Sequence, residues 1–260
     1  MATTIYFFTG TGNSLSISKE LCNSIKDCEL KPISKIWNQE NHVTSSEKVG
    51  FIFPLYYWGL PLIIKEFTQK VTFANTSYIF AVVTAGGDVE GIPFIQIDQI
   101  LKGKSKRLNA SFLITMPSNF IIGGNQKTEE EHREKLLNAK KLIPDIAEII
   151  NKSEDHFEIS TSERRAKTFG KMNAKFHSRV KESDKFFYVD ENCTGCGICE
   201  NVCSLNNIIL KDSIPKWLHN CQQCLACINY CPENSIQYRD ATLGKRRYHH
   251  PEINPEDLRL

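Results

Sequence analysis

The sequence predicts an α/β protein in two parts, a doubly wound parallel sheet followed by a small α+β unit rich in cysteine. Over the first part, apolar runs typical of buried strands alternate with helical patterns, which favours parallel strands joined by helices. Near the C-terminus, eight cysteines follow one spacing written twice. We divide the chain into a sheet domain at 1–152, a helical connector at 153–185, the cysteine-rich unit at 186–240 and a tail at 241–260.

Composition limits the function classes. Hydrophobic residues make up 41% of the 260 residues, enough for a conventional core. The formal net charge of +2 argues against nucleic acid as a partner. No apolar stretch has the length of a membrane span, and the N-terminus lacks a basic leader, so we expect a cytoplasmic protein.

The expected strands and helices alternate along the sheet domain. The apolar runs lie at 5–8, 49–53, 78–84 and 112–115, with a less regular one at 30–33. Helical patterns begin at residue 15 and recur at 62–70 and 128–150, the last opening on a capping box from Thr128 to Glu131. In such sheets, ligands bind beyond the carboxyl ends of the strands.

The loop after the first run is suited to a phosphate. It lacks the lysine of a nucleotide P-loop, and Leu15 stands where a dinucleotide fingerprint has its third glycine. What remains is a hydroxyl-rich loop at a helix N-terminus, where backbone N–H groups attract an anion. Its residues are Thr9, Gly10, Thr11, Gly12, Asn13 and Ser14.

Loops after the later strands predict a pocket for a planar aromatic ligand. Three consecutive aromatic residues between prolines offer ring stacking, and a glycine-bearing loop at 84–88 allows close backbone approach. The alternative is that the aromatic residues belong to the core or an interface. The predicted ligand contacts are Pro54, Leu55, Tyr56, Tyr57, Trp58, Gly59, Thr84, Ala85, Gly86, Gly87 and Asn119.

The doubled cysteine run predicts two [4Fe–4S] clusters. Each half reads C-x2-C-x2-C-x3-C, and in this run the fourth cysteine binds the cluster of the other half. One predicted ligand set is therefore Cys193, Cys196, Cys199 and Cys231, and the other is Cys203, Cys221, Cys224 and Cys227. Zinc and a disulfide scaffold are the alternatives, but zinc ligands usually come in more widely separated pairs and disulfides need an oxidising compartment.

Three smaller features accompany these motifs. Proline follows Cys231 but Ser204 follows Cys203, so we expect the hydrogen bonding around the second set to differ. Cys22 and Cys28 share a helical pattern with leucines and are expected to be buried, unreactive thiols. The connector predicts a helix with a basic outer face, either a docking surface for an acidic partner or, as we favour, a spacer packed on the sheet domain.

The motifs resemble known families. The loop Thr9-x-Thr11-Gly12-x-Ser14 is similar to the FMN phosphate loop of flavodoxins, and residues 186–240 resemble a bacterial two-cluster ferredoxin. The whole chain resembles bacterial flavodoxin–ferredoxin fusion proteins, including the tail Arg247-Tyr248-x-His250-Pro251. The resemblance implies FMN as cofactor, a peptide near Gly59 close to flavin N5, and contacts from 84–87 to its pyrimidine edge.

Together these features predict an electron-transfer protein that passes low-potential electrons between two [4Fe–4S] clusters and FMN. No residue pattern indicates a catalytic nucleophile. The expected partner is a redox protein, either a ferredoxin-like donor or an acceptor reductase. A homodimer, with the clusters of one subunit over the flavin of the other, is the alternative to transfer within one chain. Competing functions are a flavin-dependent reductase of a small organic substrate and a redox sensor. The tail either tethers the cysteine-rich unit or supplies protons through His249 and His250.

Overall fold

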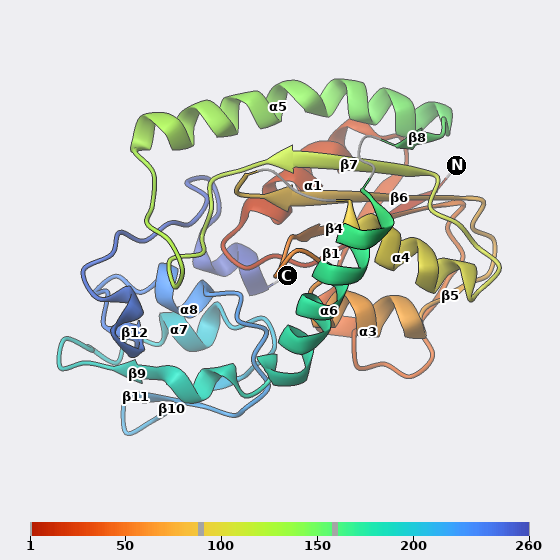
Figure 1. Ribbon diagram of the computed structural model, residues 1–260. Coiled ribbons are helices and arrows are strands. Elements are labelled where there is room, and N and C mark those ends of the chain that lie inside the picture. Colours follow the sequence, from red (N-terminus) through yellow and green to blue (C-terminus); the bar gives the residue numbers. More distant parts are fainter. Residues whose placement is uncertain (1, 88–90, 158–160, 260) are drawn as a thin grey trace.

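The computed structural model describes residues 2–87, 91–157 and 161–259. A six-stranded sheet, parallel throughout, forms its larger part (Figure 1). In spatial order the strands are β2 (Cys28–Pro32), β1 (Thr3–Phe7), β4 (Lys48–Pro54), β6 (Tyr78–Ala85), β7 (Ala110–Thr115) and β8 (His156–Phe157). The first five follow the 2-1-3-4-5 order of the flavodoxin-like fold, which confirms the doubly wound parallel sheet that the sequence predicts.

Helices cover both faces of this sheet. On one face, α1 (Asn13–Ser24) packs on β1 and β4, and α5 (Glu129–Lys152) packs on β7, through a core that includes Leu15, Phe80 and Ile146. On the other, α3 (Leu62–Lys70) and α4 (Ile92–Lys102) bury Phe67 and Ile97. The strands are apolar on both sides because both faces are covered, which explains their continuous hydrophobic runs.

Local signals account for most of these elements. The capping box at Thr128 is confirmed, with Glu131 N–H donating to Thr128 Oγ1 and Thr128 N–H to the Glu131 carboxylate. The expected strands and the helix at 62–70 are confirmed. Helix α4 is not among the helices that the sequence predicts. Short elements complete this part: α2 (Ile33–Ile36), β3 (Val43–Thr44) and β5 (Thr72–Phe73).

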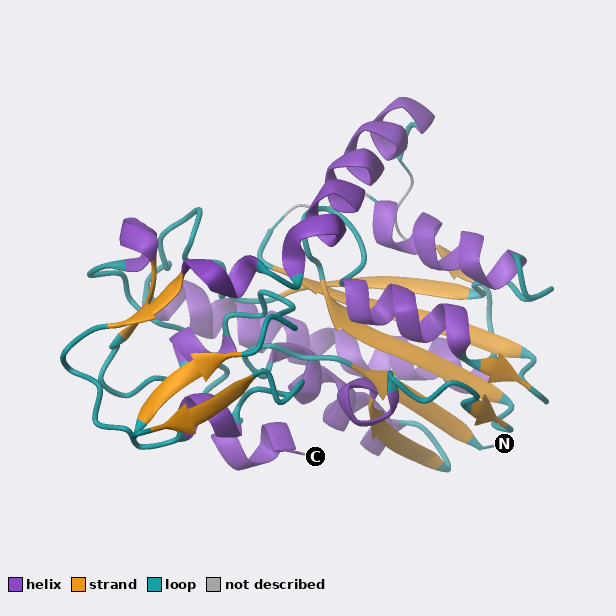
Figure 2. Cartoon of the chain, turned by 90° about the horizontal axis from the view of Figure 1, so that it is seen from below, coloured by secondary structure: helices purple, strands orange, loops and turns teal. Residues whose placement is uncertain are grey.

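Of the remaining chain, the cysteine-rich unit lies beyond the carboxyl ends of the strands (Figures 1 and 2). Helix α6 (Glu163–Val180) occupies the predicted connector and leads into two small antiparallel ribbons. The sequence repeat is visible in α7 (Ile198–Asn201) and α8 (Ala226–Asn229), whose positions correspond. The other elements are η1 (Ser183–Phe186), β9 (Phe187–Val189), β10 (Ile208–Lys211), β11 (Ile214–Trp217), β12 (Ile236–Tyr238), η2 (Arg239–Thr242) and η3 (Pro255–Arg259).

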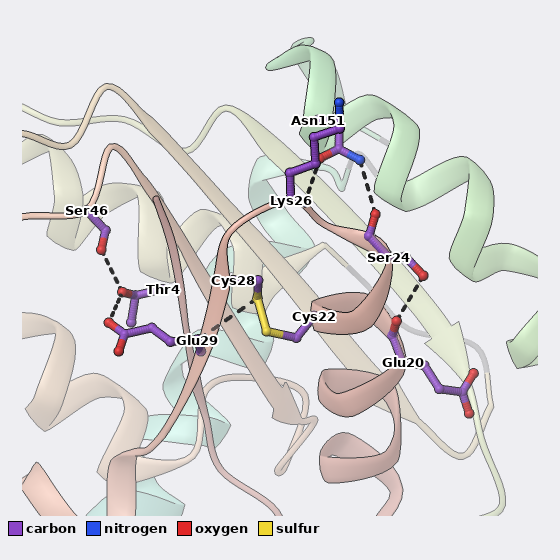
Figure 3. Close-up of a disulfide and its surroundings, with 9 residues drawn as sticks. All are labelled: Thr4, Glu20, Cys22, Ser24, Lys26, Cys28, Glu29, Ser46 and Asn151. Carbon is purple, nitrogen blue, oxygen red and sulfur yellow. Dashed lines mark hydrogen bonds between the residues drawn. A yellow bond between two sulfur atoms is a disulfide. The ribbon is translucent and has the colours of Figure 1, made fainter. Parts of the chain in front are cut away.

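The prediction for Cys22 and Cys28 is wrong. The two residues form a disulfide, and both are only half-buried (Figure 3). Cys22 lies in the last turns of α1 and Cys28 opens β2, so the short return between them brings their Cα atoms to 5.3 Å, within bonding range for a disulfide. Helical periodicity suggested a shared buried face because it carried past Ser24, where the helix ends.

Across the described ranges, no helix has both the length and the apolar character needed to cross a membrane.

Candidate functional site

Loops at the carboxyl ends of β1, β4, β6 and β7 enclose a cavity of about 260 Å³, the strand-end pocket. Most of the predicted ligand contacts line it, together with residues that the sequence does not predict. The lining consists of Thr9, Gly10, Thr11, Asn13, Ser14, Pro54, Leu55, Tyr56, Tyr57, Trp58, Thr84, Ala85, Gly86, Pro117, Ser118, Asn119, Phe120, Phe176, Gln223 and Leu225.

Three predicted contacts do not line the pocket. Gly12 is covered by the tail, since an added Cβ there would lie 2.8 Å from Ile253. Gly59 is covered by α6 and α4, where an added Cβ would meet Asn173 and Gln96 at 2.6 Å. Gly87 faces open space, and Asp88 of the same loop lies outside the described residues.

The phosphate-loop region is built from buried hydroxyls at the N-terminus of α1. Gly12 adopts φ 98°, which allows the chain to turn into the helix, and its N–H donates to Thr9 Oγ1 at 3.2 Å. The hydroxyls of Ser14 and Thr84 lie 2.8 Å apart and join this loop to the end of β6. The first turn of a helix has backbone N–H groups without intrahelical partners. Together with the neutral hydroxyls around them, they make a site suited to a phosphate group.

The aromatic residues form a tight two-residue hairpin turn. Tyr56 and Gly59 exchange backbone hydrogen bonds of 3.0 and 3.1 Å, and the intervening Tyr57 and Trp58 have φ of 44° and 60°. Positive φ is unfavourable for bulky side chains and costs of order 1–3 kcal/mol per residue. The turn therefore persists only because its surroundings hold it.

Helix α6 supplies that support. Asn173, with none of its surface exposed, donates through Nδ2 to the carbonyls of Tyr56 at 2.9 Å and Leu60 at 3.2 Å. The rings of Phe176 and Tyr57 stack at 4.3 Å, and those of Phe169 and Trp58 at 5.3 Å. The connector helix thus packs against the pocket wall, in line with the favoured interpretation of a packed spacer. Residues 158–160, before this helix, lie outside the described residues.

The eight repeat cysteines line two further cavities. The first cysteine cavity is bordered by Cys193, Cys196, Cys199 and Cys231, and the second by Cys203, Cys221, Cys224 and Cys227. These are the two sets into which the sequence analysis divides the run. None of the eight forms a disulfide. Within the described part of the chain, no group of three or more His, Cys, Asp or Glu side chains could hold a metal ion. Ligation of clusters by these cysteines stays a prediction.

The chemistry of the second cysteine cavity suits a sulfur-rich anionic group. Backbone N–H groups already point at two sulfurs, from Asn207 to Cys203 Sγ at 3.2 Å and from Gln223 to Cys221 Sγ at 3.1 Å. Burial raises the pKa of Cys221 and Cys224 to about 12, and that of Cys199 in the first cavity to about 11. These thiols are therefore protonated at neutral pH, and any metal that they bound would have to displace their protons.

The second cysteine cavity adjoins the strand-end pocket. The carbonyl of Cys224 accepts a hydrogen bond from Asn119 Nδ2 at 3.0 Å, and an added Cβ on Gly10 would lie 2.6 Å from the same oxygen. Gln222 Oε1 accepts from Ile63 N–H at 3.1 Å, at the start of α3. Gln223 and Leu225, from the same cysteine loop, line the pocket itself.

The tail fastens the two parts together over the phosphate loop. His250 N–H donates to Thr11 O at 2.8 Å, and Tyr248 Oη donates to Asn13 Oδ1 at 2.7 Å. Burial lowers the pKa of His250 to about 4, so its imidazole is neutral at physiological pH. These contacts match the tethering role, one of the two that the sequence predicts for the tail.

The chain shows distant similarity to known proteins. No family model matches the chain. It is 27% identical over 125 residues to an FMN-dependent NADH:quinone oxidoreductase 2 of Mesoplasma florum, a match that covers 45% of this chain. The chain spans about 60% of the length of that relative.

Among solved structures, an FMN-dependent NADH-azoreductase from Bacillus anthracis matches with 10% identity and a TM-score of 0.41, covering 58% of this chain and all of the other. A flavodoxin from the domain Archaea matches with 14% identity and a TM-score of 0.35, covering 58% of this chain and 99% of the other. Because these sequence identities and TM-scores are low, the assignment of a flavodoxin-like fold rests on the strand order.

Proposed function

We propose that this protein is an electron-transfer iron–sulfur flavoprotein, in which FMN occupies the strand-end pocket and a [4Fe–4S] cluster each cysteine cavity. The observation that carries the proposal is the junction at Cys224. One peptide loop lines the second cysteine cavity and also supplies Gln223 and Leu225 to the pocket, so the two sites share a wall. FMN exchanges one or two electrons and each cluster one, which makes the pair a converter between the two kinds of carrier.

Different residues of the strand-end pocket contact the phosphate and the ring system of FMN. The N-terminus of α1, with Thr9, Thr11 and Ser14, supplies donors for the phosphate. The turn at Tyr57 and Trp58 supplies aromatic surface for the ring system. The FMN-dependent quinone oxidoreductase to which the chain is similar supports this cofactor.

Four thiols border each cysteine cavity, which suits a cubane that takes one cysteine at each of four irons better than a single ion. Cys196 is exposed, whereas Cys227 in the second cavity is buried. We infer that an external redox protein exchanges electrons at the first cysteine cavity. The cluster in the second cysteine cavity then passes these electrons to FMN in the pocket of the same chain, and no second subunit is required.

The test is anaerobic reconstitution followed by chemical analysis and EPR. We expect about eight iron atoms and one FMN per chain, with signals from two interacting reduced clusters. Replacement of Cys193 and Cys196 by alanine provides the matched control, with about half the iron and unchanged FMN. Protein that takes up FMN but no iron would overturn the cluster assignment, and protein with iron but no flavin would overturn the pocket assignment.

A flavin-dependent reductase is the second candidate function. It is favoured by the pocket wall, where Tyr57, Trp58 and Phe120 are each more than a third exposed and leave an accessible side. The discriminating measurement is reoxidation of the reduced protein by a small quinone with no second protein present. Rapid, saturable reoxidation would favour the reductase, and dependence on an added redox protein would favour the relay.

A further inference from the structure

Helix α6 carries a row of basic side chains on one face. The five residues recur every three or four positions, which places them on the same side of a helix. They are Arg164, Lys167, Lys171, Lys175 and Arg179, and we call them the basic stripe. All five are exposed, and Figure 1 shows α6 at the front of the molecule with no segment drawn over it.

The opposite face of α6 is the one that packs on the sheet domain. Asn173 is fully buried there, and the ring of Phe176 stacks on that of Tyr57. Lys171 and Lys175 each lie two residues from Asn173, so they project from the other side of the helix. A packed spacer and a docking surface therefore use different faces of α6, and packing on one face leaves the other free.

The charge of the basic stripe is not neutralised by other described residues. None of its five members forms an ion pair within the described part of the chain, whereas Lys181, just after the helix, pairs with Glu66 at 3.1 Å. Helix α6 itself contains one acidic residue, Glu163. The whole chain has a net charge of +2, and without the stripe it would have −3, so its positive charge is concentrated here. Such a concentration attracts and orients a partner of opposite charge.

The basic stripe belongs to a helix that also lines the strand-end pocket. Phe176, the pocket residue of α6, directly follows Lys175 of the stripe. Tyr57 and Trp58, which stack on the same helix, line the pocket and are 39% and 38% exposed. A protein docked on the stripe is therefore held about one helix diameter, roughly 10 Å, from the pocket lining.

The chemistry of α6 favours an acidic protein over other anionic partners. A membrane surface also requires an apolar face that inserts, but the apolar side of α6 is already packed, and Met172 is its one exposed large apolar residue. Nucleic acid is an extended polyanion, and the charge of −3 outside the stripe would repel it. A compact acidic protein can contact the stripe alone.

We propose that the basic stripe docks an acidic redox protein, which accepts electrons from FMN in the strand-end pocket. The electron-transfer step rests on the proposed function, because it needs FMN in that pocket. In each transfer one electron leaves reduced FMN and enters the redox centre of the partner, no covalent bond is made or broken, and protons released by FMN pass to solvent. The first cysteine cavity then serves the electron donor and the stripe serves the acceptor.

The test uses oxidised rubredoxin, a small acidic protein with one redox-active iron, as the probe for the partner. The variant K167Q/K171Q/K175Q removes three charges from the stripe and keeps good helix formers. We expect its affinity for rubredoxin at low salt to fall about tenfold, the scale of three exposed charge pairs, as measured by isothermal titration calorimetry. The matched control K26Q/R133Q/K141Q removes three charges from exposed positions on other elements and should change the affinity less than about twofold.

Stopped-flow spectroscopy of the reconstituted protein adds a kinetic readout. Reduction of rubredoxin by the pre-reduced protein should be about tenfold slower in the stripe variant at low salt, since fewer encounters are steered to the pocket side. At high salt the variant and the wild type should react at equal rates, because screening removes the attraction. Iron content, FMN content and reduction of the clusters by a bacterial ferredoxin should be unchanged in the variant.

The outcomes separate the docking surface from the proposed function. Unchanged affinity in the stripe variant, or an equal loss in the control, would overturn the docking surface and leave the iron–sulfur flavoprotein intact. Tighter binding of a DNA duplex, or of vesicles rich in anionic lipid, than of rubredoxin would overturn the choice of an acidic protein. Stripe-dependent binding of rubredoxin by wild-type protein that holds no FMN after reconstitution would overturn the proposed function and support the docking surface.

Discussion

The first cysteine cavity includes the exposed Cys196, whereas the second adjoins the strand-end pocket, where the Cys224 carbonyl accepts a hydrogen bond from Asn119. Their cysteine spacing is identical. The difference in surroundings teaches that one repeated cysteine pattern can line two cavities that contact different parts of the fold. Under the proposed function, a cluster in the first cavity would exchange electrons with a partner and a cluster in the second with FMN in the pocket.

The largest expected effect comes from removing one cluster at a time. In Cys224→Ala and Cys196→Ala, iron should fall to about four atoms per chain, because each variant keeps one complete ligand set. Flavin reduction by a reduced bacterial ferredoxin should be lost in C224A and only slowed in C196A. Stopped-flow spectroscopy of anaerobic protein measures both rates. Equal rates in the two variants would remove the functional distinction between the cavities.

A second effect concerns how the pocket side is held. Asn173→Ala leaves the carbonyls of Tyr56 and Leu60 without their donor and frees the turn at Tyr57 and Trp58. We expect FMN affinity to fall about 10- to 100-fold, the cost of two buried hydrogen bonds, while iron content stays unchanged. Fluorescence titration of FMN measures the affinity. Asn138→Ala, at an exposed position on α5, is the control, and a similar loss there would show that the effect is not local.

Much of this arrangement follows from local sequence signals, and the rest depends on contacts between distant segments. Each strand, the hydroxyl-rich loop and each half of the cysteine repeat is a pattern of neighbouring residues. The sequence alone therefore reveals them. Asn173 and Phe176 reach the pocket from more than 100 residues away, in a segment whose only local signal is a basic amphipathic helix. The Cys22–Cys28 disulfide was missed because it depends on where α1 ends.

We expect acid to lower the stability of the fold through His250, which lies over the phosphate loop. Its pKa is lowered to about 4 by burial, with smaller effects from Glu252, Lys140 and His249. Above the ordinary pKa of about 6.5 both the folded and unfolded states are neutral, so the fold keeps its full stability there. Below it the unfolded state takes the proton first. By pH 5 we expect a loss of about 2 kcal/mol in the free energy of unfolding.

Urea unfolding of the wild type and His250→Asn at pH 7 and pH 5 measures this loss. The variant should show a smaller decrease between the two values, because it no longer carries the buried imidazole. If the stability of the wild type and of the variant changed equally with pH, the pKa of His250 would be the same in the folded and unfolded states.

The smallest expected effect comes from removing a hydrogen bond between the strand-end pocket and the second cysteine cavity. Asn119→Ala removes the hydrogen bond to the Cys224 carbonyl and should lower the free energy of unfolding by about 1 kcal/mol. Asn192→Ala, at an exposed position beside Cys193, should change it by no more than about 0.5 kcal/mol. Chemical denaturation measures both, and an equal cost at the two positions would contradict the closer coupling of the second cavity to the sheet domain.

The central claim is that the second cysteine set, and not the first, holds the cluster beside the flavin. Pulsed EPR of the magnetic coupling between the one-electron-reduced flavin and a single reduced cluster tests it most directly, with C196A retaining only the second cluster and C224A only the first. The account predicts strong coupling in C196A and weak coupling in C224A. Equal coupling in the two proteins, or stronger coupling in C224A, would contradict it.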